Sequence, residues 1–270
     1  VIILMTISIV GCQNSNGEDT VTSSASQKIR INGSTSMEKL VNGLAEVISD
    51  TYPNIIIEPQ FTGSSAGIEA VNNNTADIGT SSRGLKEAEI EKGIVENVVA
   101  IDGIVVITNP SNSVDSLTKQ QLMDIYTGKI NNWQQLGGKD QPIVVIGREA
   151  GSGSRGAFEE VLELGDNAIY AQELNETGAV VGKVATIDGA IGYVALDVVN
   201  DTVKPLALDG IEANESTIKD GSYPLQRPFV MATHGPIEEQ SQAVQDVFAY
   251  LASKDGKKLI ESVGLVYPGE

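Results

Sequence analysis

The chain contains few of the residues on which metal sites and most hydrolases depend. Its 270 residues include one cysteine and one histidine, and aromatic residues make up only 4%. One cysteine excludes a disulfide within the chain, and His234 has no second histidine or cysteine to complete a zinc site. A serine nucleophile needs a base within reach, and the sequence offers almost none. We therefore expect a binding protein and not an enzyme, with no metal and no cofactor.

Basic residues are also scarce, because 18 Lys and Arg residues stand against 36 Asp and Glu residues and the net charge is −18. This balance opposes nucleic acid or an anionic membrane surface as a partner. It does not oppose a small anion in the same way, since salt screens exposed charges beyond about 8–10 Å. Local backbone dipoles and single arginines can therefore still create an anion site.

The N-terminal residues are typical of a targeting segment. Residues 1–10 are uncharged and largely apolar, but they are too few to span a bilayer. The order Ile9-Val10-Gly11-Cys12 resembles the bacterial lipobox, in which the cysteine is acylated, for example with palmitate, and becomes the first mature residue. We expect residues 1–11 to be a signal peptide whose beginning is missing, with a lipid on Cys12 and a disordered linker over 12–27. The alternative is an ordinary secretory signal that contains a cysteine by chance.

From Lys28 onward, short strands alternate with helices, which is typical of α/β layers. The apolar run over 98–107 is long for one strand, and we expect it to cross between two lobes. A second crossing is expected near Arg227. Lobe I would then contain 28–104 plus 227–270, and lobe II would contain 105–226, each a mixed sheet flanked by helices and joined to the other by a hinge.

Apolar spacing predicts the individual elements. The predicted strands cover 29–31, 55–61, 76–82, 98–107, 143–146, 190–196 and 229–233. The predicted helices cover 37–48, 68–72, 118–125, 158–162, 181–185 and 237–253. Thr118 and Gln121 have the spacing of a capping box, which supports a helix start there.

Three loops rich in glycine and hydroxyl residues lie where a predicted strand gives way to a predicted helix. Their sequences are GSTS at 33–36, GSSAG at 63–67 and GSGS at 151–154. Backbone N–H groups at a helix N-terminus are unpaired and favour anions, and glycine allows a close approach. One such loop is more often only a helix cap, but three of them together indicate an oxyanion site.

Arg148 precedes the third loop and strengthens this interpretation. A guanidinium offers paired donors that match two oxygens of a tetrahedral anion, and it stays charged. Glu149 beside it could orient the guanidinium or face solvent. The expected division of the chain places two loops on one lobe and the third, with Arg148, on the other, so that a cleft between lobes would grasp the ligand from both sides.

The segment GSGSRG at 151–156 also fits the dinucleotide-binding pattern, which is a competing hypothesis. A dinucleotide site needs a second strand that ends in an acidic residue about 20 positions further on. Residues 166–177 show no strand pattern. We therefore expect no dinucleotide at this loop.

Six segments in this order resemble the extracellular phosphate-binding receptors of bacterial phosphate ABC importers, which have a type II periplasmic-binding-protein fold. The resemblance covers almost the whole chain after the N-terminal segment. It implies a monomeric receptor, lipid-anchored on the outer face of the plasma membrane, that captures inorganic phosphate and delivers it to a membrane permease. The matching segments are INGSTSM (31–37), FTGSSAGIEA (61–70), ADIGTSSR (76–83), LMDIYTGKINNW (122–133), GREAGSGSRGAF (147–158) and GAIGYVAL (189–196).

The resemblance implies which residues contact phosphate, and one position departs from the family pattern. Ser82 stands where the best-known members have a carboxylate that accepts a phosphate proton and repels sulfate. A hydroxyl can accept as well as donate, but it discriminates less by charge. Sulfate or molybdate therefore remains an alternative ligand, and a secreted phosphate-ester hydrolase is the alternative from another class. The implied phosphate-binding residues are Ser34, Thr35, Ser36, Ser64, Ser82, Arg148, Ser152, Gly153 and Ser154.

Overall fold

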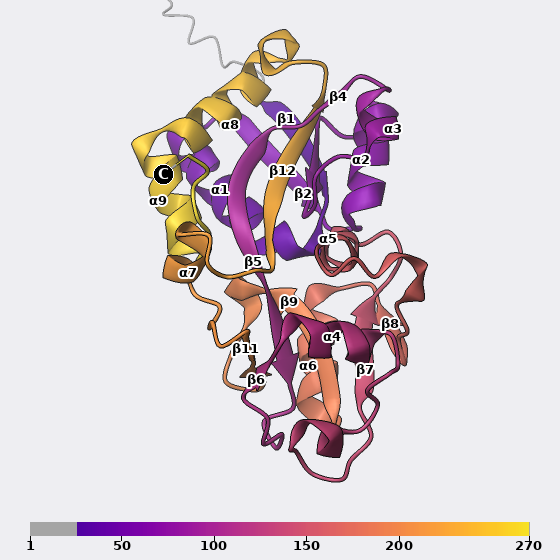
Figure 1. Ribbon diagram of the computed structural model, residues 1–270. Coiled ribbons are helices and arrows are strands. Elements are labelled where there is room, and N and C mark those ends of the chain that lie inside the picture. The colour runs from indigo at the N-terminus through magenta and orange to yellow at the C-terminus, as the bar shows by residue number, and fades with distance from the viewer. Residues whose placement is uncertain (1–25, 270) are drawn as a thin grey trace, which may run out of the picture.

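The computed structural model describes residues 26–269, which form two lobes of mixed α/β structure (Figure 1). The predicted signal peptide and the lipidation site at Cys12 lie outside the described residues. Within the described part, no helix combines the length and the apolar content that crossing a bilayer requires.

The first lobe is built on a mixed sheet with helices on its faces. Its strands β1 (Gln27–Gly33), β2 (Ile55–Gln60) and β3 (Ile78–Ser81) run parallel, and β12 (Gln226–His234) pairs with β3 in the antiparallel sense. The core contains Ile29, Leu44 and Phe229, all about 1% exposed or less. The short strand β4 (Ile94–Val95) pairs with the end of β12, and the helices are α1 (Glu38–Thr51), α2 (Ser64–Asn72), α3 (Glu87–Ile90), α8 (Gln242–Ala252) and α9 (Lys254–Ser262).

The second lobe continues the same sheet through β9 (Ala190–Ala195), β7 (Val144–Arg148) and β8 (Gln172–Leu174). Trp133 is 1% exposed, and its indole donates to the carbonyl of Gly189, so it packs as an anchor. The helices are α4 (Lys119–Tyr126), α5 (Gly153–Val161), α6 (Thr177–Thr186) and α7 (Glu215–Lys219), and the small strands are β6 (Ser116–Leu117), β10 (Lys204–Pro205) and β11 (Ala207–Leu208).

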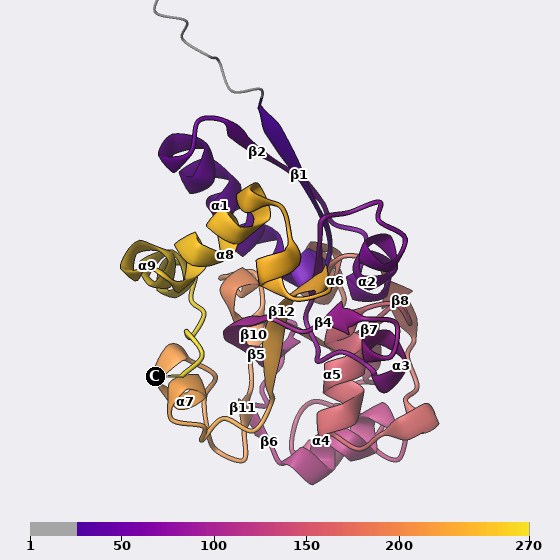
Figure 2. The same cartoon turned by 90° about the horizontal axis from the view of Figure 1, so that it is seen from above.

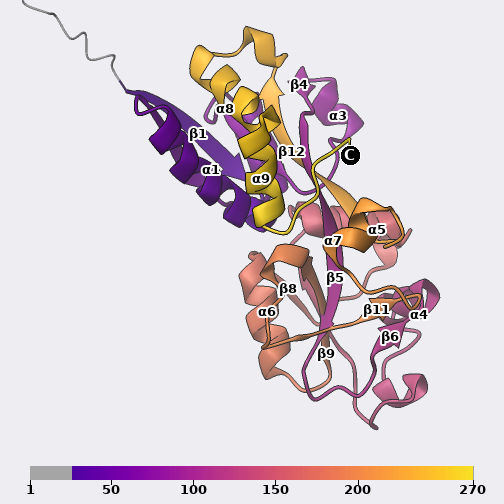
Figure 3. The same ribbon diagram turned by 90° about the vertical axis from the view of Figure 1, so that its left-hand side faces the viewer.

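The long strand β5 (Val98–Thr108) belongs to both lobes, as the side view in Figure 3 shows. Its first half pairs with β12, and its second half, from Ile104, pairs with β9. Arg227 on β12 lies directly opposite Asp102 on β5. Two antiparallel crossing strands therefore connect the lobes, and a charged pair lies in register between them. Seen from above in Figure 2, α5 lies beside this connection.

The structure corrects several predicted boundaries. Helix α2 begins at Ser64 and α6 at Thr177, each four residues earlier than expected, because hydroxyl and glycine residues of the loops already form the first helical turn. The expected helix over 237–253 is divided into a 3-10 turn at Ile237–Glu239 and α8, which Ser241 caps. The expectation of no strand over 166–177 was wrong, since β8 is a short edge strand whose residues are exposed or half-buried and show no apolar alternation.

Candidate functional site

The first glycine-hydroxyl loop begins where β1 ends. Gly33 has φ 145°, and a Cβ there would lie 2.1 Å from the carbonyl oxygen of Thr80, so a side chain is not tolerated. The Ser34 N–H donates to that carbonyl at 3.0 Å and to the Thr80 hydroxyl at 2.9 Å. The Ser34 hydroxyl accepts from the N–H of Ser36 and caps a 3-10 turn at Thr35–Met37. This cap directs the buried side chains of Thr35 and Ser36 toward the other lobe.

The second and third loops meet across the lobes. Ser64, at the start of α2, accepts a hydrogen bond from the N–H of Ser82 at 3.2 Å and lies 3.4 Å from the Ser82 hydroxyl. Gly153, at the start of α5, packs on this pair, because a Cβ there would lie 2.3 Å from the Ser64 Oγ and 2.8 Å from the Ser82 Oγ. The N–H of Ser65 donates to the carbonyl of Gly151 at 3.0 Å. Glycine at 153 therefore allows the helix start to approach the hydroxyls of the first lobe.

Arg148 ends β7 and is 2% exposed. Its guanidinium donates to the hydroxyls of Thr177 and Thr35, each at 3.0 Å, and to the carbonyls of Leu174 and Asn175 at 3.0 and 2.8 Å. Among residues 26–269, all these side-chain partners are neutral. Burial lowers the pKa of Arg148 to about 10, which leaves the side chain charged at neutral pH. A buried positive charge without a carboxylate bound to it is a site for an anion.

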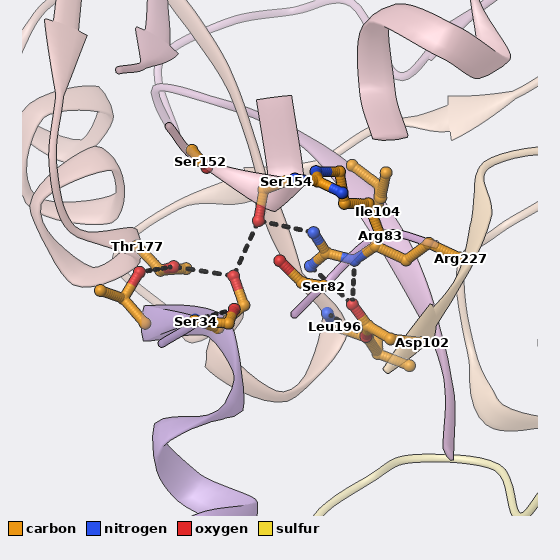
Figure 4. A network of polar contacts seen from close by, with 12 residues as sticks. Ser34, Ser82, Arg83, Asp102, Ile104, Ser152, Ser154, Thr177, Leu196 and Arg227 are labelled. Atoms are coloured by element: carbon orange, nitrogen blue, oxygen red, sulfur yellow. Dashed lines mark hydrogen bonds and ion pairs between the residues drawn. The ribbon is translucent and has the colours of Figure 1, made fainter. Parts of the chain in front are cut away.

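Hydroxyls from both lobes form one network that runs from Thr177 to Ser154 (Figure 4), and Arg148 donates to two of its members. The Ser36 Oγ lies 2.8 Å from the Ser154 Oγ and 2.9 Å from the Thr177 Oγ1, and the Thr35 Oγ1 lies 3.0 Å from the Thr177 Oγ1. All four of these residues are at least 92% buried. Donors from the 3-10 turn after β1, from α5 and from α6 therefore converge on one region between the lobes.

Sequence reasoning missed Thr177. Its signal was present, because Thr177-Gly178 is a fourth hydroxyl-glycine pair at the start of a helix. The pair was overlooked because the predicted helix began at Val181.

Arg227 and Asp102 form a second buried charged group beside the hydroxyls, and sequence reasoning assigned them no role. The Arg227 Nε and Nη2 lie 2.8 and 2.7 Å from the Asp102 Oδ2, and Arg227 Nη1 donates to the Ser154 Oγ at 2.5 Å (Figure 4). Burial raises the pKa of Asp102, and the guanidinium opposes that rise. No local pattern marks these two residues, which are 125 positions apart and meet only through strand pairing.

Three residues beside the glycine-hydroxyl loops have other contacts. Ser152 is buried, but its hydroxyl caps α5 by accepting from the N–H of Arg155. Arg83 makes no hydrogen bond to Ser36, Ser154 or Thr177, and its guanidinium pairs with Glu89 at 2.8 Å. The carboxylate of Glu149 neither orients Arg148 nor only faces solvent, because it accepts from the N–H of Gly151 at 2.5 Å.

The site's chemistry is that of a hydrogen-bond donor cluster. His234 is exposed at the end of β12, and within residues 26–269 no group of three or more histidine, cysteine, aspartate and glutamate residues is arranged to hold a metal ion. The presence of β8 removes the reason given above against a dinucleotide site. A different observation opposes that site: Gly153 and Ser154 are buried between the lobes against Ser64 and Ser82, so the nucleosides that extend from a pyrophosphate would have no space there.

Comparison with known proteins places the chain in a family. A family model described as a PBP superfamily domain matches residues 19–255. The chain is 34% identical to the phosphate-binding protein PstS of Bacillus subtilis over 241 residues, which cover 87% of this chain and 79% of that protein. It is 26% identical to the phosphate-binding protein PstS of Borreliella burgdorferi over 278 residues, which cover 98% and 96%.

Solved structures agree with this relationship. A putative phosphate ABC transporter substrate-binding protein from Clostridium perfringens, with bound phosphate, superimposes with a TM-score of 0.86 at 34% identity, covering 89% of this chain and 99% of that one. An ABC-type phosphate transport receptor from Vibrio cholerae gives a TM-score of 0.74 at 32% identity, covering 90% and 100%. The chain therefore belongs to the PBP superfamily and, within it, to the family of phosphate-binding proteins PstS.

Proposed function

We propose that this protein is a receptor that binds one inorganic phosphate between its lobes and delivers it to the permease of an ABC importer, without catalysing a reaction. The relatives named above as phosphate-binding and phosphate transport proteins support this function. The proposed ligands are Ser34, Thr35, Ser36, Ser64, Ser82, Arg148, Ser152, Gly153 and Ser154, with Ser34 and Ser152 acting through the backbone geometry that their hydroxyl caps maintain.

One observation carries the proposal: Arg148 is a buried cation whose contacts are hydroxyls from both lobes and backbone carbonyls. A buried charge without a counter-charge destabilises a protein, so such a group is retained where a ligand supplies the opposite charge. Each surrounding hydroxyl can turn its hydrogen toward an oxyanion. A tetrahedral anion would thus receive donors from both lobes and hold them together.

The names of the relatives favour phosphate over other tetrahedral anions as the ligand. Among the proposed ligand residues, Ser82 supports this choice least. Its hydroxyl lies 3.4 Å from the Ser64 hydroxyl and can accept a phosphate proton, but it cannot repel sulfate as a carboxylate would. A hydrolase is disfavoured because no histidine or carboxylate contacts the hydroxyls of Ser34, Ser64 or Ser152 in the described part of the chain.

The lobe boundaries and the membrane anchor belong to the same proposal. We place lobe I at 28–104 plus 227–270 and lobe II at 105–226, with the hinge in the crossing strands β5 and β12. Lipidation of Cys12 would hold a monomeric receptor at the outer face of the plasma membrane, close to its permease. Metabolic labelling with a fatty acid in the producing bacterium tests this anchor, since Cys12→Ala should abolish the label.

A competition titration tests the ligand. Protein stripped of phosphate is titrated calorimetrically with phosphate and with sulfate, from mildly acidic to mildly alkaline pH. Tight phosphate binding with much weaker sulfate binding supports the proposal. Binding of sulfate with equal or greater affinity would assign the protein to another oxyanion, and turnover of a generic phosphomonoester would assign it to the hydrolases.

A further inference from the structure

Arg227 is held in a fixed orientation behind the hydroxyl network. Its side chain and that of Asp102 are fully buried, and the carboxylate binds the guanidinium through Oδ2. The other carboxylate oxygen, Oδ1, accepts from the N–H of Leu196 at 3.2 Å, just after β9. Asp102 is thus fixed by the backbone, and it fixes Arg227 in turn.

The bond from Arg227 to Ser154 determines what the Ser154 hydroxyl can do. A guanidinium only donates hydrogen bonds, so the Ser154 Oγ must be the acceptor in their 2.5 Å contact. A hydroxyl has one hydrogen, and that of Ser154 must therefore point away from Arg227. The next oxygen is the Ser36 Oγ, 2.8 Å away on the other lobe.

The opposite end of the network is constrained in the same way. The Thr177 hydroxyl accepts from Arg148 Nη1, so the hydrogen of Thr177 also points away from an arginine. The Ser36 Oγ lies 2.9 Å from the Thr177 Oγ1. Two donor-only groups thus face each other through a short row of hydroxyls. The row has four contacts but five hydrogens, three from the hydroxyls and two from the arginines, so one hydrogen is left for a ligand.

We propose that Arg227, fixed by Asp102, is a positioning residue that directs the Ser154 hydroxyl hydrogen away from itself and toward the ligand, and so makes the site prefer oxyanions with more unprotonated oxygens. For inorganic phosphate this means that the dianion binds more tightly than the monoanion, because the second P–OH group of the monoanion is a poorer acceptor for the Ser154 hydrogen and competes with Arg227 for the lone pairs of the Ser154 Oγ. The inference rests on the proposed phosphate function. It adds to that function a residue, remote from the glycine loops, that sets which protonation state is bound.

The first test is a double-mutant cycle between Arg227 and Ser154. Because Arg227→Gln alone would leave Asp102 buried and unpaired, the neutral pair Asp102→Asn with Arg227→Gln is used, and Arg227→Lys serves as a second variant that keeps a charge for Asp102. The neutral pair should weaken phosphate binding about tenfold in the presence of Ser154. With Ser154→Ala in the background, it should change affinity by less than about twofold.

The second test is the ratio of phosphate affinities at mildly alkaline and mildly acidic pH. The charged groups near Arg227 include Asp102, Arg148 and Asp197, and Arg83, Lys86 and Glu160 line a cavity together with it. Both profiles are therefore recorded with Asp197→Asn present, because burial raises the pKa of Asp197 to about 7. With Arg227 and Asp102 intact, the ratio should exceed one. It should fall several-fold in the neutral pair. It should also fall in Arg227→Lys, because a lysine cannot contact Asp102 and Ser154 at the same time. In the Ser154→Ala background, the neutral pair should leave the ratio unchanged, which separates hydroxyl orientation from a general effect of charge.

The matched control is Arg83→Gln with Glu89→Gln. It neutralises another arginine–carboxylate pair, next to Ser82, whose guanidinium binds Glu89 and has no hydrogen bond to Ser36, Ser154 or Thr177, and phosphate affinity should stay within about twofold. Equal effects of the control and the neutral pair, or additivity with Ser154→Ala, would overturn the role of Arg227. If the unaltered protein binds no phosphate at any pH, the proposed function fails and this inference fails with it.

Discussion

Replacing Arg148 with methionine should remove most of the affinity for phosphate while leaving the fold intact. Methionine keeps much of the side-chain length, so the change removes the charge and the donors without opening a large cavity. The guanidinium uses its Nε–H, both Nη2 hydrogens and one Nη1 hydrogen in bonds to Leu174, Asn175, Thr35 and Thr177. One Nη1 hydrogen remains, and the bonds to the two threonine hydroxyls can be exchanged for bonds to an anion.

The size of the effect follows from the burial of the charge. Burial lowers the pKa of Arg148 to about 10, which corresponds to roughly 3 kcal/mol of unfavourable burial that an anion can relieve. A hydrogen bond to a charged group contributes about 1.5–3 kcal/mol. Because these two quantities overlap, we expect a loss of about 2–4 kcal/mol in binding free energy, or roughly 30- to 1,000-fold in Kd.

Isothermal titration calorimetry on phosphate-stripped protein measures this loss, and thermal unfolding with and without phosphate provides an independent check. The variant should lose most of the phosphate-induced rise in Tm, which depends on the ratio of ligand concentration to Kd. Arg30→Met is the control, because it removes the same charge from a half-exposed pair with Asp77. Unchanged phosphate affinity in Arg148→Met, with the control also unchanged, would refute the argument that a buried unpaired cation carries the binding.

Three further predictions concern single residues. Gly153→Ala should weaken phosphate binding at least tenfold, since the new Cβ would lie 2.3 Å from the Ser64 Oγ. Calorimetry measures the affinity, and a wild-type Kd would contradict the close approach of the lobes at this position. Ser82→Asp should raise the preference for phosphate over sulfate at least tenfold by charge repulsion, and equal competition by sulfate in both proteins would contradict it. Burial and the nearby Asp102 raise the pKa of Asp197 to about 7. Between about pH 4 and about pH 7, the carboxyl is therefore protonated in the native state and ionised in the unfolded state. The free energy of unfolding should fall as the pH rises through this range. Asp197→Asn should remove this fall and gain about 4 kcal/mol of unfolding free energy above neutral pH and nothing near pH 4. Urea-unfolding free energies measured across this pH range test it, and parallel profiles for the two proteins would contradict it.

The elements around the glycine loops could be predicted because their local chemistry has few alternatives. Gly33 has a positive φ and packs against the Thr80 carbonyl, and Thr118 forms the expected reciprocal cap with Gln121. In α1 the apolar side chains recur on one face and are buried. In each case the residue types accept few local conformations, so a pattern in the sequence is sufficient to predict the element.

The remaining features depend on contacts between distant segments. Strand β8 forms because it pairs with Ile146 to Arg148 at the sheet edge, although its own residues lack an apolar pattern. Arg227 and Asp102 are each unremarkable in sequence, and only the register between β12 and β5 places them opposite each other. Likewise, Thr177 reaches Ser36, 141 positions earlier, only when the lobes are in contact. Such pairings are set by the tertiary fold, which no local window contains.

The two buried arginines of the site are not equivalent, and their partners explain why both are present. Asp102 neutralises Arg227, so Arg227 adds little net charge to the site. Its role is to orient the hydroxyl hydrogen of Ser154. Arg148 has no such carboxylate bound to it in the described structure, so it retains a charge that a ligand can balance. A chain with a net charge of −18 can therefore have a site of the opposite sign, because screening separates the exposed acids from a single buried cation. Loss of Arg148 should consequently affect all phosphate species strongly, whereas loss of Arg227 should be smaller and should depend on the protonation state of the ligand.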